Sequence, residues 1–222
     1  TLYLQKSLNH IEQITAFSHE LYRKLKKSNQ PELSVQALLI AQEIHEVKKD
    51  SQRILSGLSK ITIQKSNDDL FLSDVLGFVV SANEKYSEML GKKITFHLKM
   101  TTDFITHQQI QLLALLNNLT ANGVEAIAEK GKIDIEINEE CEFISFIIKD
   151  SGNGIPEKDL SIIFEPGYTT KFNDHGVAAT GIGLSHVHEI VHTLHGQIEV
   201  ESQTEEGTTF RMMLPAETIR KR

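Results

Sequence analysis

Cysteine is almost absent from this 222-residue sequence. Cys141 is the only one, so no disulfide can form within the chain and a reducing compartment fits best. The sequence also lacks an apolar run long enough to cross a bilayer, and no signal-peptide pattern opens it. We therefore expect a cytoplasmic chain without membrane contact. Because it begins with Thr1, we expect a piece of a longer protein, whose parent can still be membrane-anchored.

An excess of positive charge is missing too. The formal net charge is −7, which argues against a nucleic-acid partner, because such partners usually need a basic face. The remaining composition, 40% hydrophobic and 24% charged residues, is ordinary for a soluble globular protein. The length allows one large domain, or a smaller domain with a helical appendage.

Two long helices are predicted in the first 63 residues. Apolar side chains recur at helical spacing over residues 1–27, Ser28–Pro31 interrupts the pattern, and a heptad seam follows over residues 32–61. A short turn between two helices makes an antiparallel hairpin. A single hairpin cannot bury seams this wide, so we predict a homodimeric four-helix bundle. The alternative is that the hairpin packs on its own globular domain.

Gln64–Asp69 is polar, so residues 64–71 are predicted to be a linker to a second domain over residues 72–218. Helical patterns cover Leu72–Leu90, ending at Gly91, and a Leu-rich stretch from Thr106 to about Lys130, stopped by Gly131. Alternating or continuous apolar runs predict strands near residues 94–100, 133–137, 143–148, 197–201 and 208–214, with a further helix at 183–194. The predicted fold class is α+β: the helical hairpin, then an α/β sandwich with a mixed sheet covered by helices on one face.

Polar side chains and glycines point to a nucleotide site in this second domain. Asn118 and Asn122 lie four residues apart on one face of a Leu-rich helix, and an amide oxygen is a reasonable ligand for a hard cation. Asp150 follows an apolar strand and opens a glycine-containing turn. Gly181 and Gly183 begin a helix, whose free N–H groups favour phosphate.

These segments resemble the motifs of sensor histidine kinases. Asn118–Ala126 resembles the N box, and Asp150–Ile155 resembles the first glycine box. The F box, the second glycine box and the Gly-Thr-Thr-Phe element are matched by Ile163–Pro166 with Thr170–Lys171, by Thr180–Leu184 and by Glu206–Phe210. All five occur in the family's order, which identifies the domain as a member of the ATP-binding superfamily shared with gyrase, Hsp90 and mismatch-repair ATPases.

The resemblance implies the roles of individual residues. Asp150 would accept a hydrogen bond from the adenine amine, Asn122 would ligate Mg²⁺, and Asn118 and Glu125 would lie near the phosphates or metal-bound water. Lys171 could approach the γ-phosphate, and Phe172–Thr180 would be a lid over ATP. Ala179 lies where many relatives carry another glycine. The remaining expected contacts to the nucleotide are Gly152, Gly154, Ile155, Thr170, Gly181, Ile182, Gly183, Leu184 and Thr208.

Two histidines are candidates for the phosphoryl acceptor that such a kinase needs. His19-Glu20 resembles the family's H box and leaves room for a second bundle helix, so it is the first choice. His45-Glu46 is the second choice, because no second long helix follows it. In each pair the carboxylate can hold the proton on one ring nitrogen and sharpen the nucleophilicity of the other.

The family pattern is not matched at every position after His19. Lys24 replaces the usual proline, so the helix should lack a kink. Arg23 stands where Thr or Asn often positions water for dephosphorylation, which predicts weak phosphatase activity.

The whole pattern implies an ATP-dependent, autophosphorylating histidine kinase whose partner is the receiver domain of a response regulator. The alternative is a superfamily ATPase, or a phosphorelay or scaffold protein, without histidine autophosphorylation.

Overall fold

The computed structural model describes residues 21–28, 33, 35–37, 70–171 and 181–221. The chain divides into two compact units, Thr1–Asn67 and Asp68–Arg222. In the first unit residues 21–27 are helical, and the Ser28 N–H donates to the Lys24 carbonyl at 3.0 Å. The helix therefore runs through Lys24 without the break that proline would cause. Residues 33 and 35–37, in the second predicted helix, are helical too, and the other residues of the predicted hairpin lie outside the described part of the chain.

The second unit is built on a five-stranded sheet. Its strands are β2 (Lys93–Met100), β4 (Lys130–Glu140), β5 (Phe143–Asp150), β6 (Gln197–Gln203) and β7 (Gly207–Pro215). They lie in the order β2-β4-β5-β7-β6. The β2–β4 pair is parallel, and the other neighbours are antiparallel. The predicted mixed sheet is confirmed.

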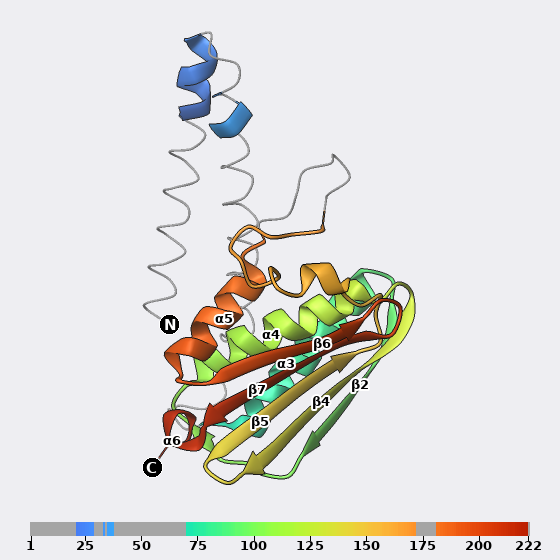
Figure 1. Ribbon diagram of the computed structural model, residues 1–222, viewed down its shortest axis with the longest axis vertical. Coiled ribbons are helices and arrows are strands. Elements are labelled where there is room, and N and C mark those ends of the chain that lie inside the picture. Colours follow the sequence, from blue (N-terminus) through green and yellow to red (C-terminus); the bar gives the residue numbers. More distant parts are fainter. Residues whose placement is uncertain (1–20, 29–32, 34, 38–69, 172–180, 222) are drawn as a thin grey trace. The chain divides into compact units, whose positions relative to one another are not determined.

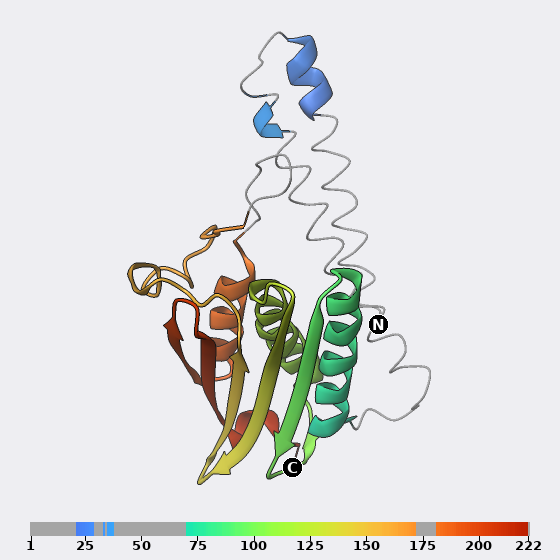
Figure 2. The ribbon, with the colours of Figure 1, turned by 90° about the vertical axis from the view of Figure 1, so that its right-hand side faces the viewer.

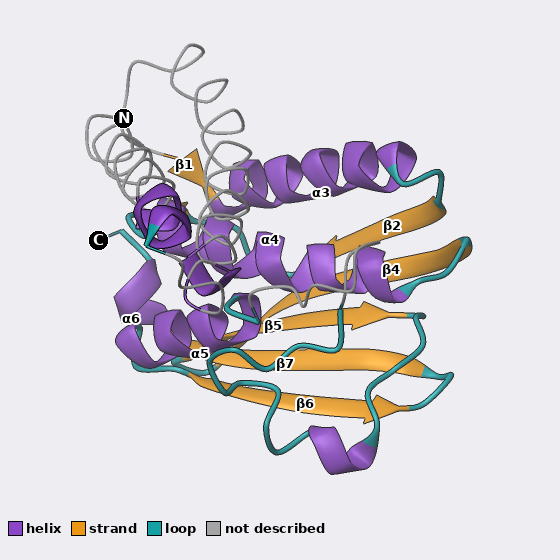
Figure 3. Ribbon diagram, turned by 90° about the horizontal axis from the view of Figure 1, so that it is seen from above, coloured by secondary structure: helices purple, strands orange, loops and turns teal. Residues whose placement is uncertain are grey.

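Three helices cover one face of this sheet, as Figures 1 and 2 show. They are α3 (Leu72–Met89), α4 (Gln109–Ala126) and α5 (Gly183–Thr193). Helix α4 contacts both of the others and lies between them, as the view from above shows (Figure 3). The prediction of helices on a single face is confirmed.

Alternation along the strands explains this one-sided cover. In β4, Ile133, Ile135 and Ile137 are buried, while the residues between them are partly exposed and polar. Successive side chains of a strand point to opposite faces, so the apolar face meets the helices and the polar face meets solvent. Leu112, Leu115 and Leu116 of α4 are fully buried against it.

The end of α4 differs from the prediction. We expected the helix to run to about Lys130 and to stop at Gly131, but α4 ends at Ala126 and Gly131 lies within β4. The reason for glycine is packing: a Cβ at Gly131 would lie 2.6 Å from the Ser151 hydroxyl oxygen and 2.9 Å from a methyl carbon of Ile127. Gly131 therefore permits close contact and does not end a helix.

Several short elements were not predicted. Strand β1 (Leu70–Phe71), in the segment assigned to the linker, pairs with β3 (Ile105–Thr106). A 3-10 helix, η1 (Glu157–Asp159), follows the first glycine turn, and α6 (Ala216–Ile219) follows β7. Thr106 Oγ1 donates to the Ile219 carbonyl at 2.6 Å, which fastens α6 to β3. Among the described residues no helix is long and apolar enough to cross a membrane.

Candidate functional site

Helix α4 places three of the predicted site residues on one face. Asn118, Asn122 and Glu125 are separated by four and three positions, which brings their side chains to neighbouring places on a helix. The Asn118 amide nitrogen donates to the Ala114 carbonyl at 2.9 Å. A Cβ at Gly183 would lie 3.3 Å from the Asn118 amide oxygen, so that oxygen lies against the first turn of α5.

Asp150 lies at the end of β5 with only 5% of its surface exposed. Its Oδ1 accepts a hydrogen bond from the Gly152 N–H at 2.8 Å. Gly123 of α4 leaves room for it, because a Cβ there would lie 3.0 Å from the Asp150 Cβ. Burial raises the pKa of the Asp150 carboxyl above its ordinary value of 3.8, and backbone hydrogen bonds from Gly152 and Thr208 offset this only in part.

The first glycine turn packs tightly on two neighbours. A Cβ at Gly152 would lie 2.7 Å from Ala126 atoms at the end of α4. Gly154 has a φ of +68°, and a Cβ there would lie 2.1 Å from the Gln203 carbonyl oxygen. Gly154 needs glycine for its backbone conformation and for space, and Gly152 needs it for space alone.

Ser202 of β6 joins the end of this turn to the last strands. Its Oγ accepts from the Ile155 N–H at 2.7 Å, donates to the Gly207 carbonyl at 2.9 Å and lies 2.9 Å from Thr208 Oγ1. Thr208 is buried and pairs with Asp150 across β5 and β7. Sequence reasoning missed Ser202, because a serine in an alternating strand carries no signal of its partners.

The second glycine segment lies at the start of α5. Gly181 has a φ of +62°, and its carbonyl accepts from the Gly167 N–H at 3.2 Å. Ile182 precedes α5 and provides no side-chain cap, so the N–H groups of the first turn remain directed at whatever lies before the helix. Gly183 and Leu184 are half-buried in this turn, and Ile182 is 48% exposed.

Lys171 meets the residues of α4. Its Nζ donates to Asn122 Oδ1 at 2.9 Å and forms an ion pair with the Glu125 carboxylate. The Tyr86 hydroxyl of α3 donates to the other Glu125 oxygen at 2.7 Å. Tyr86 was not predicted as a site residue, because a tyrosine on an amphipathic helix is as typical of packing as of a functional site.

Of the remaining predicted residues, only Thr170 belongs to the described part of the chain. Thr170 is exposed beside Lys171. The candidate acceptors and their carboxylates, and the predicted lid with Ala179, lie outside the described residues; they are His19, Glu20, His45, Glu46 and Phe172–Thr180.

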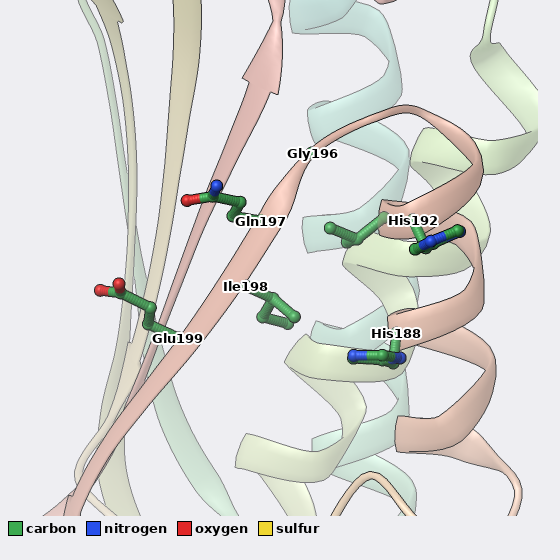
Figure 4. A pocket seen from close by; sticks show the side chains of 7 residues that line it. His188, His192, Gly196, Gln197, Ile198 and Glu199 are labelled. Carbon is green, nitrogen blue, oxygen red and sulfur yellow. The ribbon is translucent and has the colours of Figure 1, made fainter.

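A separate pocket of about 340 Å³ lies between the C-terminal half of α5 and the start of β6. Figure 4 shows His188 and Ile198 at this pocket, with Gln197 and Glu199 on the other side of the strand. The His188 ring also packs against Phe164, with 5.4 Å between ring centroids. Gly183 and the glycine turn before it lie at the opposite end of α5. The pocket is therefore not the cluster around Asp150.

The oxygens of Asn122 and Glu125 fit a hard divalent cation. Mg²⁺ is bound through oxygen ligands and usually takes one or two protein groups together with phosphates and water. Both oxygens accept hydrogen bonds from the Lys171 ammonium, so Asn122 and Glu125 are arranged to hold a cation. The described part of the chain contains no cluster of three or more His, Cys, Asp or Glu that could hold a metal ion. A metal at Asn122 and Glu125 would therefore need phosphates and water as further ligands.

The chain is similar to several histidine kinases. Sensor histidine kinase GlnK of Bacillus subtilis (strain 168) is 42% identical over 217 residues, 97% of this chain and 52% of that protein. Sporulation kinase A of the same organism is 33% identical over 165 residues, 73% of this chain and 26% of that protein. The chain thus spans about half the length of the first relative and about a quarter of the second.

The fold is likewise shared with a solved structure. The catalytic domain of the histidine kinase ThkA, in a nucleotide-free form, superposes with a TM-score of 0.55 at 26% identity, over 66% of this chain and 95% of that domain. Residues 107–218 match the family described as histidine kinase-, DNA gyrase B- and HSP90-like ATPase. These residues include α4, the glycine turn after Asp150, α5 and β7. This chain therefore belongs to the histidine kinase-, DNA gyrase B- and HSP90-like ATPase family.

Proposed function

We propose that this chain is the catalytic core of an ATP-dependent protein histidine kinase. The observation that carries the proposal is the assembly of Asn118, Asn122 and Asp150 with the two glycine turns in one domain of this ATPase family. The names of the relatives, sensor histidine kinase and sporulation kinase, support the same activity. The chain would act in a two-component system, in which the phosphoryl group would pass from its histidine to an aspartate in the receiver domain of a response regulator.

The adenine and the phosphates would meet different ends of the cluster. Asp150, buried and fixed by the Gly152 N–H, would accept a hydrogen bond from the adenine amine, which selects adenine over guanine. The uncapped first turn of α5 would receive the phosphates, because helix N-termini bind anions through free N–H groups and the helix dipole. Gly152, Gly154, Ile155 and Thr208 would line the adenine side, and Thr170, Gly181, Ile182, Gly183 and Leu184 the phosphate side.

Asn122 is proposed as the Mg²⁺ ligand, with Glu125 and Asn118 near the phosphates or metal-bound water. When bound, Mg²⁺ would neutralise charge that develops on the phosphates during transfer. The protein's own contribution is positioning and fixed hydrogen-bond donors. Lys171 adds a positive charge on the same face of α4.

His19 is proposed as the acceptor, with His45 as the second choice. A neutral imidazole nitrogen would attack the γ-phosphorus, a nitrogen–phosphorus bond would form, and the bond to the bridging oxygen would break to release ADP. Glu20 would hold the proton on the other ring nitrogen and stabilise the charge that the ring acquires. Two copies of the chain would form a homodimer through the predicted four-helix bundle, which carries His19. Residues 172–180 are proposed as the lid over ATP.

Incubation with γ-labelled ATP and Mg²⁺ tests this function. Label is expected on the wild-type chain, and it should be lost in His19→Gln and in Asn122→Ala. His97→Gln is the matched control, because His97 is exposed and pairs with Asp134 on the open face of the sheet. Loss in His45→Gln with retention in His19→Gln would move the acceptor to His45. Label that survives both histidine changes would refute the kinase mechanism.

The second candidate is an ATPase without histidine autophosphorylation. This alternative is supported by the family description, which includes DNA gyrase B- and HSP90-like ATPases. That function predicts release of inorganic phosphate while the protein stays unlabelled. Measuring both products in one reaction separates the two functions.

A further inference from the structure

Lys171 occupies the oxygen pair that the proposed metal would use. Its Nζ lies 2.9 Å from Asn122 Oδ1 and pairs with Glu125 Oε2. A hard cation would seek the same amide and carboxylate oxygens. An ammonium and a divalent cation compete for these oxygens, because two positive charges held a few ångströms apart repel each other.

The acceptors are fixed more firmly than the lysine. The Tyr86 hydroxyl holds the other Glu125 oxygen at 2.7 Å. Lys92 donates to the main-chain carbonyls of Val124 and Glu125, each at 3.0 Å, and so holds the last turn of α4. Lys171, in contrast, lies on an irregular segment, and its side chain is 47% exposed against 31% for Glu125. Of the two partners, the lysine is the one that can leave at low cost.

We propose that Lys171 is a tethered counter-cation of Asn122 and Glu125, which a metal–nucleotide complex must displace. This inference rests on the proposed function, because it concerns the same Asn122 and Glu125. In this arrangement the Lys171 ammonium offsets the negative charge of Glu125. When Mg²⁺ arrives with a nucleotide, Lys171 leaves Asn122 and Glu125. With ATP its ammonium would then approach the γ-phosphate, whereas ADP has no γ-phosphate for it to meet.

This exchange predicts a result opposite to that for a lysine that only binds phosphate. A phosphate-binding lysine strengthens nucleotide binding with or without metal, so its removal weakens both. A competing lysine weakens only the binding that needs the metal position. The quantity that separates them is the metal dependence of ADP affinity, that is, the Kd in EDTA divided by the Kd in Mg²⁺.

Isothermal titration of the full chain with ADP, in EDTA and in saturating Mg²⁺, measures this ratio. In Lys171→Met the ratio should rise about 3- to 10-fold, since a partly exposed ion pair and one hydrogen bond no longer have to be broken. Lys171→Gln keeps a polar side chain without the charge and should raise the ratio in the same direction. Lys132→Met is the matched control: it removes an ion pair with Asp134, 2.9 Å long, on the open face of the sheet, and should leave the ratio unchanged.

Each outcome decides the point. If the wild-type chain binds ADP and the ratio is unchanged or lower in both Lys171 variants, Lys171 is not a counter-cation. The proposed function is not affected by that result. A wild-type chain that binds no adenine nucleotide in either condition removes the proposed function, and the counter-cation with it. A ratio that rises equally in Lys132→Met also overturns the proposal, because the effect would then come from net charge.

Discussion

Replacing Asp150 by asparagine should make the nucleotide-free protein more stable while it loses nucleotide affinity. Asp150 is 5% exposed, and the groups that support its charge are neutral: the backbone N–H groups of Gly152, at 2.8 Å, and of Thr208. Asparagine has nearly the same shape and can keep the Gly152 hydrogen bond through its amide oxygen. The substitution therefore removes the buried charge and little else.

The sign follows from the direction of the pKa. Burial raises the pKa of Asp150 in the folded chain above its ordinary value of 3.8. Between that value and the folded pKa, the folded state binds the proton more tightly, so stability falls as pH rises. Above both values the cost of the ionised carboxylate is constant, and below both it vanishes. The asparagine variant escapes this cost.

The expected gain at pH 7 is on the order of 1 kcal/mol, the usual scale for a buried polar group that lacks a full set of partners. For a domain of this size that corresponds to a rise in Tm of about 2–4 °C. The nucleotide effect has the opposite sign. If the free oxygen of Asp150 accepts from adenine, an amide NH₂ there would face a donor, and ATP should bind at least about tenfold more weakly.

Thermal unfolding of both proteins from pH 8 to pH 4, with ATP titrations at pH 7, tests both halves. The Tm difference should be present at neutral pH and shrink as pH falls through the folded pKa of Asp150. Asp134→Asn is the control of opposite sign: burial raises its pKa, but hydrogen bonds from Lys132 and His97 outweigh this and lower it. It should lower stability at pH 7 by about 0.5 kcal/mol or less. A neutral-pH Tm for Asp150→Asn at or below wild type would refute the buried-charge account.

Two further changes test the packing around the site. Gly154→Ala should lower the unfolding free energy by at least about 2 kcal/mol, because φ is +68° and the new Cβ would lie 2.1 Å from the Gln203 carbonyl oxygen; chemical denaturation measures it. Gly77→Ala in α3 is its control. It should stabilise the protein by up to about 1 kcal/mol, because a Cβ at Gly77 would have no atom within 4 Å. Similar losses of unfolding free energy in both variants would contradict the packing argument. Thr106→Val should cost about 1–3 kcal/mol by leaving the Ile219 carbonyl without its 2.6 Å hydrogen bond, and hydrogen exchange at residues 216–221 should rise, whereas unchanged exchange there would refute the anchoring role.

The strands and long helices of the second unit could be predicted because their signal is local. Ile133, Ile135 and Ile137 alternate in the sequence, and they are buried in the structure. Gly91 ends the predicted helix near Leu90 and has a φ of +70°, as expected for a C-terminal glycine. Each of these features depends on a few adjacent residues, so periodicity alone was sufficient.

The errors arise where the reason for a residue lies far away in the sequence. Gly131 was interpreted as a helix stop, but it is glycine because Ser151 and Ile127 occupy the space that a Cβ would need. Two-residue strands such as Leu70–Phe71 have no measurable period, and they form because Ile105–Thr106 offers a partner. The order of the strands also depends on pairings between distant segments. No local pattern encodes such a choice.

The same limit applies within the candidate site, and there it changes the chemistry. The motifs place Asn122, Glu125 and Lys171 near a nucleotide, with the lysine directed to a phosphate. In the structure that lysine contacts the asparagine and the glutamate instead, and Tyr86, from a helix outside every motif, donates a hydrogen bond to the glutamate. A motif records which residues a ligand will meet, whereas the partners of those residues before the ligand arrives are set by the fold. Because ligand binding is measured as a difference between these two states, the affinity for metal and nucleotide depends on contacts that the motifs do not contain.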